Sequence, residues 1–257
     1  MKRTFLAMAC AAVISLTGCS IMWDSQQLSS AAGKALTAAS ISDAQIIQLC
    51  QNTAAKMDAS ATIDNGDYQK RLAKVLSGVK TVGDRPLNFK VYKTNQVNAF
   101  ALADGSIRVY SGLMDVMDDA ELTAIIGHEI GHVAHGDSKK AMKKAYLTSA
   151  ARDLVGAAGT VGAISSAVLG DISESFANAQ FSQSQEYKAD DYGFEFSVAR
   201  GYSPYSMSNA LDKLVGLSQG SQASAVAQMF SSHPDSEARA KKMKLKAVQY
   251  AGTKSGK

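Results

Sequence analysis

The pattern of apolar and polar positions predicts helices at both ends of the chain and a short β region between them. Helical periodicity begins near Ser42, which has the spacing of a capping box with Gln45. A second helical pattern runs from Asp67 to Val79. After Gly112 the chain follows the helical period almost to its end.

Three short runs have the composition of β-strands, namely Asn88 to Tyr92, Asn98 to Leu102 and Ile107 to Tyr110. The residues Ala-Asp-Gly-Ser at 103–106 separate the last two runs and predict a hairpin turn. Turn-forming residues also occupy 83–86. We therefore expect an α+β fold in which a small sheet accompanies many helices.

The first residues have the pattern of an export signal. Lys2 and Arg3 precede a short apolar run from Phe5 to Leu16, which is typical of a secretory signal. The run ends in Leu-Thr-Gly followed by Cys19, which resembles a bacterial lipobox. In that interpretation Cys19 becomes the lipidated N-terminus; the alternative is a plain signal peptide with a coincidental cysteine. The predicted divisions are 1–18 as signal peptide, 19–40 as lipidated cysteine and flexible tether, and 41–257 as the folded domain.

Lipidation at Cys19 predicts a location as well. Two or three acyl chains anchor a protein stably to a membrane, where a single chain does not. The residue after the cysteine is Ser20 and not Asp. By resemblance to lipoproteins of Gram-negative bacteria, this favours the periplasmic face of the outer membrane.

Composition excludes several classes of protein. The 257 residues are 46% hydrophobic and 19% charged, which suits a globular domain. The net charge of +4 is too small to indicate nucleic-acid binding. If Cys10 is removed and Cys19 acylated, Cys50 is the one remaining cysteine and cannot form an intrachain disulfide. We expect it to be buried. The uncharged segment 154–170 favours a mobile or closely packed small-residue helix over a re-entrant membrane segment.

The strongest chemical signal is the sequence His128-Glu129-Ile-Gly-His132. Histidines four positions apart lie on one face of a helix, so both imidazoles can point at one ion. Asp118 and Glu121 have capping-box spacing and predict where this helix begins. The pattern indicates a zinc site of the metalloprotease type.

A catalytic zinc ion needs a third protein ligand and an open position for water. Candidates are His135, His233 and carboxylates further along the chain. Glu186 and Asp190 are the best pair, because their i, i+4 spacing lets one bind metal while the other orients a ligand histidine. The alternative is an ordinary acidic surface helix. For His135 we expect an exposed position at the helix end, and occupation of the open metal position is the alternative.

Three motifs occur in a characteristic order: His-Glu-x-Gly-His at 128–132, Glu-x-x-Ala-Asp-x-x-Gly at 186–193, and Ser-His-Pro at 232–234. Together they resemble the HtpX-like gluzincin peptidases, over roughly Ser42 to Val248. The resemblance implies a zincin-type α+β domain, mostly helical, with a small sheet beside the active-site helix.

The same resemblance implies residue roles. One Zn²⁺ per chain would be held by His128, His132 and Glu186, with Glu129 as general base. Zinc lowers the pKa of bound water to about 7 and polarises a peptide carbonyl. A glutamate next to a ligand can take the water proton and return it to the leaving amine.

Further roles follow from the resemblance in the same way. Asp190 would orient a ligand histidine, and His233 would face the cleft and stabilise the oxyanion. The family's active-site edge strand corresponds to Asn98, Ala99, Phe100 and Ala101. An extended substrate could add to such a strand through backbone hydrogen bonds.

The sequence therefore predicts a zinc metalloendopeptidase of the bacterial cell envelope that acts on polypeptides. By family analogy its substrates are unfolded or misassembled envelope proteins, and its partners are envelope assembly factors or proteases. The competing hypothesis is a lipoprotein chaperone or assembly factor with a latent or structural zinc site.

Overall fold

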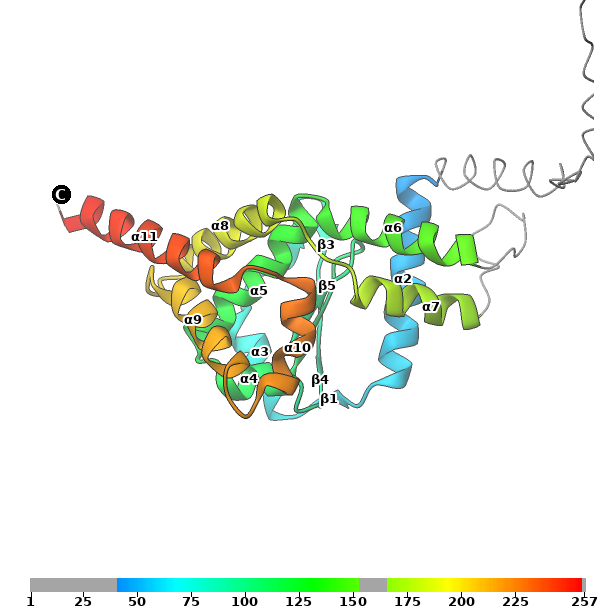
Figure 1. Ribbon diagram of the computed structural model, residues 1–257, viewed down its shortest axis with the longest axis horizontal. Helices are drawn as coiled ribbons and strands as arrows, with labels where there is room; N and C mark the ends of the chain where they lie inside the picture. The colour runs from blue at the N-terminus through cyan, green and yellow to red at the C-terminus, as the bar shows by residue number, and fades with distance from the viewer. Residues whose placement is uncertain (1–40, 153–165, 256–257) are drawn as a thin grey trace, which may run out of the picture.

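A four-stranded mixed sheet lies at the centre of the computed structural model, which describes residues 41–152 and 166–255 (Figure 1). Its order is β1 (Ile63–Asp64), β4 (Asn88–Tyr92), β6 (Ser106–Tyr110) and β5 (Ala99–Ala101). β4 and β6 are parallel, whereas β1 and β5 are antiparallel to their neighbours. β5 therefore forms an edge of the sheet.

The β regions expected from sequence are present, with small changes at their ends. The run 88–92 forms β4 without change, and β5 is one residue shorter at each end than the expected run. Gly105 forms the predicted turn between β5 and β6 with a φ of 90°, and a Cβ there would collide with the carbonyl oxygen of Pro86. Of the turn residues expected at 83–86, only 83–84 form a turn, and 85–86 form β3 (Arg85–Pro86), which pairs with β2 (Thr81–Val82) in a separate hairpin.

Helices account for most of the remaining described residues, as expected. Both predicted capping boxes are confirmed, at Ser42 with Gln45 and at Asp118 with Glu121. The helix expected over 67–79 ends at Val75, because Gly78 with its φ of 81° turns the chain. The helices are α2 (Asp43–Ser60), α3 (Asp67–Val75), α4 (Ser111–Val116), α5 (Asp119–Ala134), α6 (Asp137–Arg152), α7 (Ser166–Ala177), α8 (Gln183–Ala199), α9 (Ser206–Ser218), α10 (Ala223–Ser232) and α11 (Ser236–Ser255).

The two faces of the sheet are covered by different helices, α5 on one side and α2 on the other (Figure 1). Alternation along β6 decides which residue meets which helix. Ile107 and Val109 join the apolar core that contains Ile126 of α5. Arg108 points the other way and pairs with Asp58 at the end of α2, with its Nε 2.8 Å from Oδ1.

Close packing of α5 against α8 sets the position of the site. Small residues make this approach possible, because a Cβ on Gly131 would lie 2.9 Å from Cβ of Tyr192. A Cβ on Gly193 would lie 2.9 Å from the amide nitrogen of His128 and would collide with the carbonyl oxygen of Ala124. The glycines of the two motifs therefore let the backbones come near enough for their side chains to share one centre.

A second apolar cluster joins α2, α6 and α7 and contains Cys50, which is fully buried. Burial raises the pKa of this thiol to about 12, so the expected structural role fits. Residues 1–40 and 153–165 lie outside the described part of the chain. The predicted signal peptide, lipidated cysteine and tether fall there, as does most of the segment 154–170, whose last residues belong to α7. Among the described helices, none has the length and apolar character needed to cross a membrane.

Candidate metal centre

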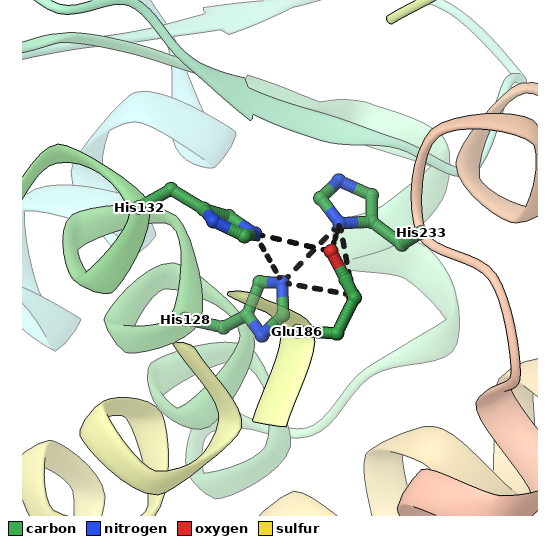
Figure 2. Close-up of side chains that lie close together, drawn as sticks. All are labelled: His128, His132, Glu186 and His233. Atoms are coloured by element: carbon green, nitrogen blue, oxygen red, sulfur yellow. Dashed lines mark hydrogen bonds and ion pairs between the residues drawn. The ribbon is translucent and has the colours of Figure 1, made fainter. Parts of the chain in front are cut away.

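Four side chains that can bind a metal converge at the junction of α5, α8 and the end of α10 (Figure 2). His128 and His132 project from the same face of α5, Glu186 comes from the first turn of α8, and His233 directly follows α10. Each offers one donor atom, and these atoms all lie within 4.8 Å of one another. All four side chains are buried.

The distances within the cluster are short. Nε2 of His128 is 3.0 Å from Nε2 of His132 and 3.3 Å from Nδ1 of His233. The carboxylate of Glu186 places Oε1 3.1 Å from Nδ1 of His233 and 3.4 Å from Nε2 of His132. The three sequence motifs that define the resemblance thus meet at one point in space.

The outward-facing nitrogens of the two α5 histidines both meet carboxylates. Nδ1 of His128 is 2.8 Å from Oδ1 of Asp190, and Nδ1 of His132 is 3.4 Å from Oδ2 of Asp137. A carboxylate that accepts a hydrogen bond from Nδ1–H leaves Nε2 of a neutral imidazole with a lone pair for a metal. When both rings are neutral, the two Nε2 lone pairs face each other and a cation between them removes their repulsion. Nitrogen and oxygen donors of this kind suit zinc, so the residues fit the ion.

The protonation of the cluster follows from burial and charge. Burial lowers the pKa of His128 to about 4, so its imidazole is neutral. Burial also opposes the charge on His132, but hydrogen bonds to Asp137 and Glu186 outweigh it and raise the pKa to about 9. Burial alone would raise the pKa of Glu186, yet the neighbouring His233 and His132 hold it well below its ordinary value. Glu186 is therefore an anion that is ready to bind a cation.

Arg239 on α11 is a member of the site that the sequence patterns did not reveal. Its side chain is 2% exposed, with Nη1 2.5 Å from Oε2 of Glu186. Its Nη2 and Nε lie 2.7 and 2.8 Å from the two oxygens of Asp190. Burial would raise the pKa of Asp190, but Arg239 lowers it to about 2. In the sequence Arg239 stands beside a run of lysines, so nothing local separates it from a solvated basic helix face.

Beside the cluster lies a cavity of about 260 Å³. It is lined by the strand β5 together with Glu129 and His233. Glu129 is 2% exposed, its Oε1 has no hydrogen-bond partner in the described part of the chain, and burial raises its pKa. Nε2 of His233 is 3.7 Å from that oxygen. The predicted base, the predicted cleft histidine and the predicted edge strand thus surround one space.

His135 lies apart from this centre. It is exposed at the C-terminal end of α5, and its ring contacts Tyr192 with centroids 6.1 Å apart. The structure therefore places it at the helix end, as expected, and outside the group of donor atoms.

Comparison with known proteins agrees with this geometry. Residues 63–247 match the family model described as peptidase family M48. The chain belongs to peptidase family M48. This M48 chain is 44% identical to metalloprotease LoiP of Escherichia coli (strain K12), over 93% of its own length and 95% of that relative. It is 39% identical to metalloprotease YcaL of the same organism, over 93% of its length and 96% of the relative.

More distant relatives are larger proteins. The M48 chain is 28% identical to the beta-barrel assembly-enhancing protease of Yersinia pestis, over 70% of its own length but 37% of the relative. The resemblance inferred from the motifs is confirmed, and with it the mostly helical zincin domain and the metalloprotease activity.

Proposed function

We propose that this M48 metalloprotease is a zinc endopeptidase of the bacterial cell envelope that hydrolyses unfolded or misassembled envelope proteins. The observation that carries the proposal is the position of Glu129. Glu129 and the edge strand line one cavity beside the histidine–glutamate cluster, and the buried Oε1 of Glu129 accepts no hydrogen bond from the described residues. An orphaned carboxylate oxygen in such a place is suited to accept a proton from water.

In this proposal His128, His132 and Glu186 hold the zinc ion. The ion, when bound, supplies Lewis-acid activation of water and of the peptide carbonyl. Oε1 of Glu129 takes the proton from the attacking water and returns it to the leaving nitrogen. Asp190 keeps His128 in the tautomer whose Nε2 lone pair faces the cluster. His233 donates a hydrogen bond to the oxyanion that develops in the cavity.

The edge strand β5 would bind an extended substrate through its backbone groups. Hydrogen bonds from the Tyr110 amide to Asn98 and from the Leu102 amide to Ser106 fix the register with β6. The carbonyl of Ala99 and the backbone groups of Ala101 then point away from β6, toward the free edge. Recognition through backbone groups requires an unfolded segment and tolerates many sequences.

Anchoring through lipidated Cys19 would hold the domain at the outer membrane, on its periplasmic face. The lipobox pattern at the end of the apolar run supports this. Replacing Cys19 by Ala in the full chain should release the protein from the membrane fraction into the periplasmic fraction. Retention in the outer membrane by this variant would contradict lipid anchoring.

The central experiment compares wild type with Glu129→Gln on an unfolded protein substrate, using the chain from Ser20 onward, with zinc content measured on both. We expect equal zinc content and a loss of cleavage of at least about 100-fold, the lower range for a general base. Full activity in the variant would contradict the role of Glu129.

The four-donor cluster also bears on the alternative of a latent or structural zinc site. Structural zinc sites have four protein ligands, and Nδ1 of His233 lies among the donor atoms. If zinc is present and neither protein cleaves, His233→Ala tests whether His233 fills the open metal position. Cleavage gained by this variant would indicate a latent enzyme and would exclude His233 as the oxyanion residue.

A further inference from the structure

Asp137 contacts the metal centre from a third helix. It is the first residue of α6, is 2% exposed, and its Oδ2 lies 3.4 Å from Nδ1 of His132. Its other oxygen, Oδ1, accepts a hydrogen bond of 2.7 Å from Nε2 of Gln185, the residue before Glu186. A buried carboxylate therefore connects α5, α6 and α8 at the position of the ligand histidine.

The orientation of this carboxylate is determined by its surroundings. Oε1 of Gln185 accepts hydrogen bonds from the amide and the hydroxyl of Ser182, at 2.9 and 2.8 Å. The amide group of Gln185 must then present its NH₂ to Asp137. Since Oδ1 is occupied in this way, Oδ2 is the oxygen available to His132.

The face of the same imidazole meets an aromatic ring. Phe181, four residues after the end of α7, stacks on His132 with ring centroids 4.0 Å apart and 15° between the planes. Its backbone amide donates to the carbonyl of Ser232, 3.2 Å away, which fixes Phe181 beside the cluster. Asp137 at the start of α6 and Phe181 after α7 thus contact His132 from its edge and from its face.

We propose that Asp137 and Phe181 are the positioning residues of His132. Asp137 accepts a hydrogen bond from Nδ1–H of His132, which leaves the Nε2 lone pair for the metal, and Phe181 sets the plane of the ring. The proposal rests on the zinc site of the proposed function and concerns His132, although the Phe181 ring also stacks on His233 at a longer centroid distance of 5.4 Å. His128 has a separate partner in Asp190, whose charge Arg239 neutralises at both oxygens. Within the described residues no arginine pairs with Asp137, and the lysine beside it is Lys140, whose side chain is 68% exposed.

The test measures metal binding and not only activity. Zinc affinity is determined by competition with a chromophoric chelator for wild type, Asp137→Asn, Asp137→Ala and Phe181→Leu, in the chain from Ser20 onward. The cobalt(II) absorption spectrum and the melting temperature of the metal-free protein are recorded for each. Lys140→Gln is the matched control, because it removes a charge next to Asp137 and leaves the carboxylate in place.

We expect Asp137→Asn to bind zinc about 10- to 100-fold more weakly, the usual loss when the partner of a ligand histidine is changed. Its metal-free melting temperature should fall, because Asp137 and His132 form a buried pair without the metal as well, but the weaker zinc affinity should come with an altered cobalt spectrum. Phe181→Leu should shift the cobalt spectrum, and Lys140→Gln should leave the zinc affinity unchanged.

Wild-type zinc affinity in both Asp137 variants would overturn the proposal. So would a weaker affinity matched by an equal loss of metal-free stability with an unaltered cobalt spectrum, since Asp137 would then serve only the fold. If Asp137→Ala does not fold, Asp137→Asn decides the outcome. Failure of wild type itself to bind zinc would instead contradict the proposed function, so the two failures are distinguishable.

Discussion

The guanidinium of Arg239 lies against the carboxylate of Glu186, with Nη1 2.5 Å from Oε2, and both side chains are buried. The same guanidinium holds Asp190. A single cation from α11 therefore compensates two buried carboxylates on α8 before any metal binds. The close approach of so many acidic groups in the apolar interior depends on it.

Replacing Arg239 by Leu should destabilise the metal-free protein by about 3–5 kcal/mol, because two buried carboxylates lose their counter-charge. Zinc should restore more stability to the variant than to wild type, since the ion supplies part of the missing charge. Urea unfolding with and without zinc measures both effects. The control is Lys242→Leu on the same helix. The ammonium of Lys242 is exposed and lies 3.7 Å from the ring centroid of Tyr187. Losing this contact should lower the free energy of unfolding by at most about 1 kcal/mol. Equal effects of the two changes would contradict the role of Arg239.

Glu186→Gln keeps the shape of the side chain and removes its charge. We expect zinc affinity to fall by more than about 100-fold, beyond the loss typical of a residue that only orients a ligand. Zinc titration of the purified variant provides the measurement. Glu195→Gln, an exposed acid on the same helix, should bind zinc like wild type. Unchanged affinity in Glu186→Gln would place the third ligand elsewhere.

Gly193→Ala should disturb the packing of α5 against α8. The new Cβ would collide with the carbonyl oxygen of Ala124 and approach the amide of His128, so we expect a loss of about 1–3 kcal/mol and weaker zinc binding. Thermal unfolding and zinc titration test this. Gly216→Ala in α9 is the matched control, because no neighbouring atom lies within 4 Å of its Cβ. That change should stabilise the protein by about 0.5–1 kcal/mol. Stabilisation by both substitutions would refute the close contact.

The contacts of Asp58 predict that the fold loses stability in acid, independently of the metal centre. Burial would raise the pKa of Asp58, but hydrogen bonds from Arg108, Lys90 and Tyr92 lower it below its ordinary value. A carboxyl whose pKa is lower in the folded state stabilises the fold above its unfolded pKa of about 3.9. That stabilisation is lost as the pH falls through the lower folded value.

Asp58→Asn should therefore be less stable than wild type at pH 7, and the difference should shrink below about pH 4. Denaturant unfolding at several pH values gives the comparison. Asp67→Asn, whose carboxylate is exposed, should show little change at any pH. A difference for Asp58→Asn that stays constant down to pH 2 would show that its charge has no part in the stability.

The local sequence pattern determined where many of the helices and strands of this protein form. The spacing of His128 and His132, the capping pair Asp118 and Glu121, and the run 88–92 each specify an element through contacts within a few residues. Helix periodicity also placed Glu186 and Asp190 on one face of α8. These features depend on short-range geometry, which the sequence shows directly.

Tertiary structure alone decided which charged groups meet. Arg239 lies 49 residues from Asp190, and Gln185 lies 48 residues from Asp137, yet each pair forms a hydrogen bond in the interior. No periodicity distinguishes such a residue from a solvated one, because its partner is decided by how α6 and α8 pack on α5 and how α11 packs on α8. The sequence and its resemblance to a family predicted the ligands, the base and Asp190, whereas only packing could show that Arg239 and Asp137 lie against them and that Gln185 contacts Asp137.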